Sequence, residues 1–506
     1  MMKVSRFQIL FFLLLNVVAM SAFAQDIAKA IDSRESLYGK IYASYKGLSS
    51  LQHLKYDSSL SSIDLSYSEV WQREYGLYHE GLGIRLGRFS ASTYLKGLNA
   101  LSIWGNASYS KGKEKKVKWN STLDFDRLYP YIVADSLGGD FTVEKYVFSG
   151  GLSKAFIWGS LGAQVAYRAT QGFRTVDPRP RDIVSDFEIS LSYAKNIGEK
   201  YTLGGEISYD RYSQVANVEN YNEVKQSPEW LMSGLGTEFR RITLGKSELI
   251  YTGHEAQIEL SLVPNIHRGL YANFIYGYGA IQRLVSELNV APINGYGKHR
   301  IFSKVGYLTN VGKLTCGINT KLNYEQRIGY DNVLGNAGAG EYDVIAKLEL
   351  FEANRLTSMI EFPIGYEQNQ GFSWRIVPEV SYGQLHLRNI YPDHLFKTSN
   401  ITPSLLGMIK WQKGKSAVLF EINGLYEVNL YNQSRVLKGA LSTYLVNYLD
   451  HTLEYLSHNK LQASIGLEYR HIISDKYSVG FHSQYTYKNV LRANPHALTM
   501  TISFNY

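Results

Sequence analysis

Leu498-Thr499-Met500-Thr501-Ile502-Ser503-Phe504-Asn505-Tyr506 is the stretch that decides the fold, and the chain ends with it. Apolar or aromatic side chains alternate strictly with small polar ones, so a strand formed here has one apolar and one polar face. A strand of a globular sheet has further chain to cover its apolar face, whereas no sequence follows this one. We therefore expect the apolar face to contact lipid and the polar face to line an aqueous lumen.

The N-terminus predicts export. Lys3 and Arg6 precede an apolar run over residues 9–18, and Ala22-Phe23-Ala24 provides the small residues that signal peptidase requires. These features define a signal peptide over residues 1–24 and make Gln25 the expected first mature residue.

Composition excludes several classes of protein. The single cysteine, Cys316, cannot form an internal disulfide, which excludes a disulfide-stabilised scaffold. No segment after the signal peptide has the roughly 18 consecutive apolar residues of a membrane helix. The mean hydropathy of −0.21 resembles that of a soluble protein, but a barrel hides its lipid face in alternation. The 40 tyrosines suit aromatic girdles at the two membrane interfaces.

Alternating runs joined by short polar turns recur along the chain. In the clearest pair, residues 183–194 and 201–209 each place apolar side chains on one face and polar side chains on the other. Five short turns are expected, at residues 195–200, 264–269, 310–313, 412–415 and 474–476. Long, irregular polar stretches lie between the hairpins, at residues 111–142, 213–241 and 428–460. This asymmetry is typical of barrels with short periplasmic turns and longer outer loops.

The runs from Leu60 to Tyr506 number about 18, with about 16 as the alternative count, and an even number returns both ends of the barrel to the periplasm. The predicted fold is all-β, a transmembrane antiparallel β-barrel over residues 60–506 with a C-terminal strand ending in an aromatic. Residues 25–59 are assigned to an N-terminal periplasmic or luminal segment. Within it, residues 37–45 are expected to form a short strand, a helix or an insert in the lumen.

The final strand resembles the C-terminal signal of Gram-negative outer-membrane β-barrels, whose last residue is usually Phe. The resemblance implies that Phe504 and Tyr506 form a membrane-insertion signal read by the barrel-assembly machinery. It also implies a location in the cell outer membrane, in contact with lipid and lipopolysaccharide. Tyr506 departs from the usual Phe.

Two further segments carry a more specific resemblance. One is Asp177-Pro178-Arg179-Pro180. The other contains Trp104-Gly105-Asn106-Ala107-Ser108-Tyr109, Trp119-Asn120, Pro130-Tyr131, Asp135, Gly138-Gly139-Asp140, Glu144, Tyr146, Phe148 and Gly150-Gly151. Together they resemble an uncharacterised outer-membrane β-barrel family of Bacteroidetes, a domain of unknown function. Members of that family occur near TonB-dependent uptake systems, which implies a role in nutrient acquisition and, as partner, a TonB-dependent receptor or surface lipoprotein. The chain has no room for the plug domain of a TonB-dependent receptor, so that class itself is disfavoured.

Asp177, Arg179, Arg181 and Asp182 are the candidate site residues, in an outer loop between two strands. One interpretation is a rigid latch, because prolines stiffen the segment and its charges can pair with one another. The other is a constriction or solute-binding loop whose arginines meet an anion. The lysines of residues 111–118 are expected to be solvated or to pair with lipopolysaccharide phosphates, and nucleic acid is not an expected partner.

No catalytic motif stands out. The 12 histidines include no His-Glu-x-x-His pair, and no Gly-x-Ser-x-Gly elbow is present, so no metal, cofactor or enzymatic activity is expected. His386 and His482 remain as candidates for a surface hydrolase assembled from different strands. The leading hypothesis is small-solute transport or surface binding for nutrient uptake. The alternatives are a structural or partner-binding barrel with a plugged lumen and, last, an outer-membrane hydrolase.

Overall fold

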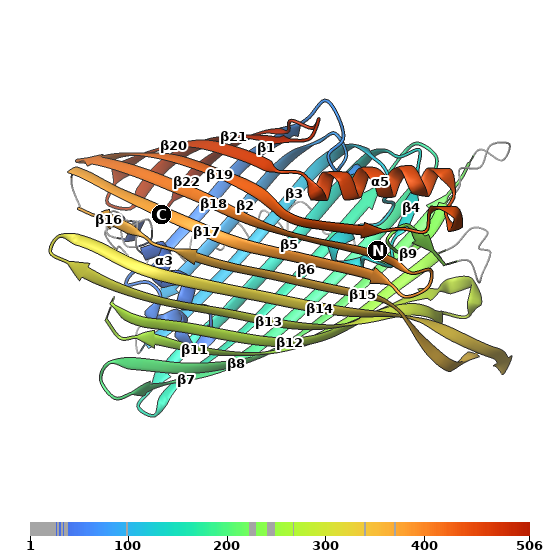
Figure 1. Cartoon of the computed structure of the whole chain (residues 1–506). Helices are drawn as coiled ribbons and strands as arrows, with labels where there is room; N and C mark the ends of the chain where they lie inside the picture. Colours follow the sequence, from blue (N-terminus) through green and yellow to red (C-terminus); the bar gives the residue numbers. More distant parts are fainter. Residues whose placement is uncertain are drawn as a thin grey trace.

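The computed structural model describes residues 27, 30–31, 34, 39–97, 100–221, 229–239, 248–266, 268–338, 341–368 and 371–506, so the predicted signal peptide lies outside the described residues. The described chain is a closed antiparallel β-barrel of 18 long strands (Figure 1). Pairing of the first strand with the last closes the barrel. The predicted fold class and the count of 18 are therefore confirmed.

Nearly every strand pairs with its neighbours in sequence. The long strands are β1 (Leu60–Trp71), β2 (Gly83–Lys96), β3 (Leu101–Val117), β5 (Gly139–Phe156), β6 (Gly159–Phe173), β7 (Arg179–Ile197), β8 (Tyr201–Glu219), β11 (Glu248–Pro264), β12 (Gly269–Val285), β13 (Ala291–Val311), β14 (Leu314–Gly338), β15 (Glu341–Glu361), β17 (Gly371–Asn389), β18 (His394–Lys413), β19 (Ser416–Arg435), β20 (Lys460–Ser474), β21 (Tyr477–Val490) and β22 (His496–Asn505). The short β16 (Ile364–Tyr366) pairs with the same two strands as β15 and continues it after an interruption at Pro363. Proline has no N–H to donate to the ladder.

The alternating apolar and polar residues of each strand form an apolar outer surface and a polar inner surface of the barrel. On neighbouring strands, Ile207 and Leu260 are 66% and 51% exposed on the outer surface, while the adjacent Glu206 and Ser261 face the lumen. Phe504 is also exposed on the outside and stacks on Tyr477. Within the described ranges, no helix is both long and apolar enough to cross a membrane.

The barrel has a turn end and a loop end. All five predicted short turns are confirmed, because strands meet there at Ile197 and Tyr201, Pro264 and Gly269, Val311 and Leu314, Lys413 and Ser416, and Ser474 and Tyr477. Tyr506 lies at the same end, where its N–H donates to the Ser61 carbonyl. The long connections all lie at the opposite end, which faces outward in barrels of this type.

The predicted extents of the long outer stretches are wrong. β3 continues to Val117, β8 to Glu219 and β19 to Arg435, well inside the segments expected to be irregular. Above the lipid, outward positions carry polar groups, such as Lys111 paired with Glu144 on the next strand. The apolar–polar alternation that identifies strands therefore disappears although the strands go on.

Residues 39–59, called here the inner plug, occupy the lumen at the turn end. They contain α3 (Gly39–Tyr45) and a 3₁₀ turn, η2 (Ser49–Leu54). Leu48 is fully buried in a cluster that includes Ala194 of β7 and Tyr271 of β12, and Ile41 also packs against Met408 of β18. Because these strands lie on different sides of the barrel, the inner plug spans the lumen (Figure 1).

Residues 118–138, residues 229–239 and α5 (Thr443–Ser457), together called the outer plug, fold into the loop end. The first two segments include α4 (Phe125–Leu128) and join in a three-stranded sheet of β4 (Val133–Asp135), β9 (Glu229–Gly234) and β10 (Thr237–Glu238). The ring of Trp119 lies 4.9 Å from that of Trp230 and 4.7 Å from that of Tyr448 on α5. The three parts therefore share one hydrophobic core with the inner face of the wall. The remaining loop-end turns are η3 (Tyr78–Glu80), η5 (Ser286–Leu288) and η6 (Lys438–Ala440).

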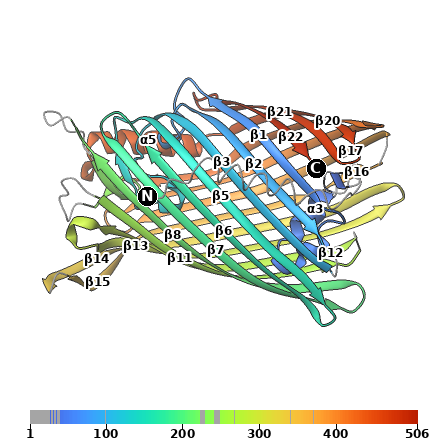
Figure 2. The same ribbon diagram turned by 180° about the vertical axis from the view of Figure 1, so that it is seen from behind.

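One hairpin projects beyond the barrel rim. β13 pairs with β14 only as far as Asp331, and β17 pairs with β15 only from Phe351. The described parts of residues 332–349, called here the projecting arm, therefore extend past the rim without flanking strands, as both views show (Figure 1 and Figure 2).

Candidate functional site

A fully buried ion pair holds the outer plug to the wall. Arg174 Nη1 lies 2.9 Å from Asp135 Oδ2, and neither side chain is exposed. Asp135 also accepts hydrogen bonds from Ser121 Oγ and the Gly138 N–H, while Arg174 Nη2 donates to the Asn120 carbonyl. The pair thus ties both ends of the 118–138 segment to the end of β6.

A second buried arginine joins the two plug segments. Arg283 of β12 donates through Nη1 to the carbonyls of Ile132 and Met232, and through Nε to Asn294 Oδ1. Its side chain is fully buried, and its guanidinium lies 5.5 Å from the Tyr131 ring centre. Because charge-assisted donors rarely remain buried without acceptors, this arrangement fixes the backbone of the plug at defined points.

The predicted site residues lie next to the Arg174 pair, and none of them lines either of the two hollows described below. Arg179 Nε is 2.8 Å from Asp177 Oδ1, and the Arg179 guanidinium lies over the Tyr221 ring. Arg181 is exposed, whereas Asp182 is fully buried. Side chains alternate along β7, so Arg179 and Arg181 share the outward side with the exposed residue 183, and Asp182 faces inward. This placement favours the latch interpretation over a lumen constriction.

The α5 helix forms one wall of the candidate site, and it lies within residues 428–460, which the sequence predicts to be irregular. Ser442 caps its N-terminus by accepting from the Leu445 N–H. Leu445, Tyr448, Leu449 and Leu453 form its buried side. Their spacing of three and four residues after a Ser cap is the signal that identifies an amphipathic helix.

The loop between β1 and β2 closes over α5. The His451 Nε2 atom lies 2.8 Å from the Gly76 carbonyl oxygen, and the Tyr78 ring lies 4.4 Å from that of His451. A Cβ on Gly76 would approach the Tyr455 ring to 2.9 Å, so the close approach of loop and helix needs glycine there. His79 then stacks on Phe125 with ring centres 3.7 Å apart.

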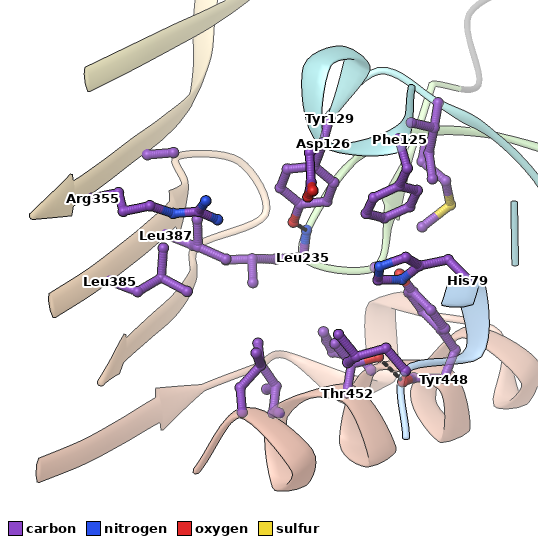
Figure 3. Close-up of a pocket in the computed structure, with 18 of the residues that line it drawn as sticks. His79, Phe125, Asp126, Tyr129, Leu235, Arg355, Leu385, Leu387, Tyr448 and Thr452 are labelled. Carbon is purple, nitrogen blue, oxygen red and sulfur yellow. Dashed lines mark hydrogen bonds between the residues drawn. The ribbon is translucent and has the colours of Figure 1, made fainter. Parts of the chain in front are cut away.

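These elements border a partly open cavity of about 190 Å³ against the inner faces of β14, β15 and β17. Its lining is mainly apolar. Phe125, Met232, Tyr448 and Leu453 come from the three parts of the outer plug, Leu77 from the loop between β1 and β2, and Leu387 from β17 of the wall. Figure 3 shows side chains from the strands, the loops and α5 converging on it. A second hollow of about 380 Å³ shares His79 and Phe125 with the first, so the stacked pair forms a partition between the two.

The polar groups of the cavity differ in their hydrogen-bond partners and in their protonation. Arg327 donates through Nη1 to the carbonyls of Asp126 and Tyr129 at 2.6 and 2.9 Å, and through Nε to Glu325 at 2.8 Å. Burial lowers the pKa of His79 to about 4, so its imidazole is neutral at pH 7. Burial also raises the pKa values of Tyr129 and Tyr448.

The inner plug is seated by polar contacts. Ser49 donates through its N–H and its Oγ to Glu206 Oε2, both at 2.7 Å. The Ser50 N–H donates to Ser192 Oγ, and Tyr45 Oη donates to Asn319 Oδ1. The backbone N–H groups of Ser49 and Ser50 therefore find their acceptors on the lumen wall.

In the part of the chain that the structure describes, no three His, Cys, Asp or Glu side chains lie together as a metal site requires. His53 Nδ1 is 3.2 Å from Ser153 Oγ and 2.9 Å from the Ser50 carbonyl, a contact between inner plug and wall. His482 pairs across strands with Glu468 and lies beside the outward Phe481, which places it on the lumen side, while His386 lies on β17 opposite Lys397.

A comparison with models of protein families shows the family to which the chain belongs. A family model matches residues 49–506. The chain belongs to this Family of unknown function (DUF6850). The match covers all of the barrel and η2 of the inner plug.

Solved structures that match this chain have low sequence identity and low TM-scores. The ferric preacinetobactin receptor BauA from Acinetobacter baumannii is 9% identical, with a TM-score of 0.40 over 89% of this chain and 80% of that chain. The CymD monoaromatic hydrocarbon channel is 9% identical, with a TM-score of 0.32 over 94% and 92%. The outer membrane protein opdK from Pseudomonas aeruginosa is 9% identical, with a TM-score of 0.35 over 89% and 99%. No curated protein matches in sequence. At these values we infer neither ligand nor mechanism from the likenesses.

Proposed function

We propose that this protein is an outer-membrane uptake barrel that is closed at rest and binds a small solute in the cavity beneath the outer plug. The observation that carries the proposal is the partly open, mainly apolar cavity between the folded-in loops and the wall. A concave apolar pocket with a few converging polar groups is the usual form of a small-molecule site.

Uptake through this barrel would require both plugs to move, because each closes one end of the lumen. The outer plug is latched to the wall through Arg174, and the inner plug spans the opposite end of the lumen. A solute held in the cavity would therefore pass only when both plugs shift. The strands need not move, because neither plug contributes a strand to the barrel wall.

Conductance in planar bilayers tests this proposal. The intact refolded protein should give no stable ionic steps. A variant that lacks residues 39–59 and also carries Asp135→Ala should conduct, because the inner plug is then absent and the 118–138 segment of the outer plug is released from the wall. Circular dichroism and gel mobility of the unheated protein establish that each barrel is folded. Silence from the folded double variant would contradict a transport path through the lumen.

A second function is favoured by the projecting arm. Ile345 is 70% exposed on it, and Val344 and Leu348 are each about 40% exposed. This part of β15 pairs with β14 on one side, and among the described residues its other edge has no partner strand. An exposed strand edge with apolar side chains is a typical docking site for another chain. We propose as the alternative that the arm binds an envelope protein, such as a surface lipoprotein or a TonB-dependent receptor. Ile345→Asp should then abolish co-purification of a stoichiometric partner that wild type retains.

A further inference from the structure

Arg355 is the cation of the cavity that lacks a protein partner. It lies on β15, opposite Glu325 of β14 and Leu385 of β17. Figure 3 shows its guanidinium pointing from the strands into the cavity. Among the described residues, it forms no hydrogen bond and no ion pair.

The structure explains why the facing carboxylate does not neutralise Arg355. Residues opposite one another in an antiparallel pair have adjacent side chains, so Glu325 is the expected partner. Glu325 instead accepts from Arg327 Nε at 2.8 Å, and Arg327 is in turn committed to two loop carbonyls. Glu325 therefore serves the outer plug, and Arg355 keeps its charge and its donors available.

The surroundings of Arg355 are apolar on the side of the cavity. Leu385 and Leu387 lie beside it on β17, and Leu449 and Leu453 of α5 complete this side. A guanidinium presents donors in a planar fork that matches a carboxylate, phosphate or sulfonate. A free guanidinium beside an apolar wall is thus complementary to a molecule with one anionic group and an apolar body.

The remaining charges fix the orientation of such a molecule. Asp126 lies on the loop side of the cavity and Glu80 near His79, so two carboxylates oppose a second anionic group at the far end. Neutral His79 offers no cation there. Arg327 is paired with Glu325 through Nε and donates through Nη1 to two plug carbonyls, so its charge is already engaged. Arg355, whose charge has no partner among the described residues, is therefore the cation that receives the anionic group.

We infer that the cavity binds a small amphipathic anion, with Arg355 holding its anionic group and the leucines of β17 and α5 covering its apolar body. This inference rests on the proposed function, because it names the class of solute taken at that site. It makes Arg355 the residue that determines specificity, while the apolar wall supplies most of the binding energy.

A matched set of three compounds tests the inference: 4-phenylbutyrate, 4-phenylbutanol and 4-phenylbutylamine share one body and differ in charge. Binding is followed by tryptophan fluorescence of the full-length protein, because Trp119 lies against the cavity residue Tyr448, and is confirmed by calorimetry. Wild type should bind the anion roughly tenfold or more tightly than the alcohol and should bind the amine least.

The variant Arg355→Gln should lose the preference for the anion and retain the affinity for the alcohol. The matched control is Arg88→Gln, because Arg88 is another exposed arginine of the lumen face that does not line the cavity. Arg88→Gln should bind as wild type does. Equal binding of all three compounds by wild type, binding of none, or an anion preference that survives Arg355→Gln would each overturn the inference.

These outcomes are separate from those of the conductance test. Equal binding of the three compounds overturns the anion site but leaves a conducting double variant as support for uptake. An anion preference that depends on Arg355, in a protein whose released form never conducts, retains the site and removes the transport role.

Discussion

Asp135→Ala is expected to release the 118–138 segment of the outer plug and to destabilise it by about 3–5 kcal/mol. The reason is the guanidinium left behind. Arg174 is 0% exposed in its pair with Asp135, so without the carboxylate its charge would remain buried with only two carbonyl oxygens as hydrogen-bond acceptors. The Ser121 hydroxyl and the Gly138 N–H would also lose their acceptor. The local cost should exceed the stability with which the segment is held.

Native-state proteolysis of the outer plug measures this effect, because cleavage there reports local opening while the strands remain paired. The matched control is Glu144→Ala, which removes an ion pair with Lys111 on the outer surface, where Lys111 is 58% exposed. Such a pair contributes about 0–1 kcal/mol. Equal cleavage rates in the two variants would contradict the role of the Asp135–Arg174 ion pair in holding the segment to the wall.

A double substitution separates the latch from simple loss of contacts. In Asp135→Leu with Arg174→Met, both charges are absent and no buried charge lacks a partner. Replacing a whole buried pair by apolar groups is often neutral. The double variant should therefore resist proteolysis better than Asp135→Ala alone. A result in which it is cleaved faster would mean that hydrogen-bond geometry, and not charge burial, holds the segment.

The barrel could be predicted from sequence because its determinant is local. Each strand that crosses lipid must alternate, as Leu498 to Tyr506 does, and each turn at the periplasmic end is short and polar. The plugs could not be predicted in this way. The backbone of residues 118–138 is held by Arg174 and Arg283 from distant strands, and no periodicity in the segment records those partners.

The candidate site, too, could be predicted from the sequence only in part. The charged box at residues 177–182 stands out in the sequence, yet its arginines lie on the outer side of β7, because one residue of register decides the face. Arg355 is one of many charged residues in alternating strands. Only the structure shows that the facing Glu325 is engaged elsewhere. The α5 helix differs, because its leucine spacing is visible in the sequence and could have predicted the helix. The polar residues between the leucines make the segment resemble an irregular loop.

Gly162→Val is expected to expel the inner plug from its seat without disturbing the barrel. A Cβ at this position would lie 2.2 Å from both the Ser49 carbonyl carbon and the Ser50 nitrogen. These are backbone atoms, so no rotamer change can relieve the clash. Gly162 itself pairs regularly with Ser153 and Ser192, and a β-branched side chain suits a strand.

The wall provides space for the plug at other glycines as well. A Cβ on Gly204 would lie 2.6 Å from Leu48 Cδ1, and one on Gly306 would lie 2.3 Å from Tyr45 Oη. Three glycines on different strands thus face three parts of the plug. Gly424 offers a matched control in the same barrel, because a Cβ there meets nothing within 4 Å.

Cysteine labelling measures whether the plug leaves. Ser50→Cys is a mild reporter, because Ser50 Oγ is buried and forms no hydrogen bond among the described residues. The parent protein carries Cys316→Ser, which removes the native thiol. Overpacking of about 1–3 kcal/mol corresponds to roughly 5–150-fold in accessibility, and a backbone clash belongs at the upper end. Gly162→Val should therefore raise labelling by a membrane-impermeant maleimide roughly 100-fold, and Gly424→Val should not change it.

Unchanged labelling in Gly162→Val would mean that the plug shifts within its seat and stays in the lumen. The inner closure would then be a permanent part of the barrel, and a solute path through the turn end would require a different opening. Increased labelling would show instead that the plug is held only by its seat. The plug continues covalently into β1 at Leu60, so a plug that has left its seat would stay tethered to the wall at the turn end and could return to it.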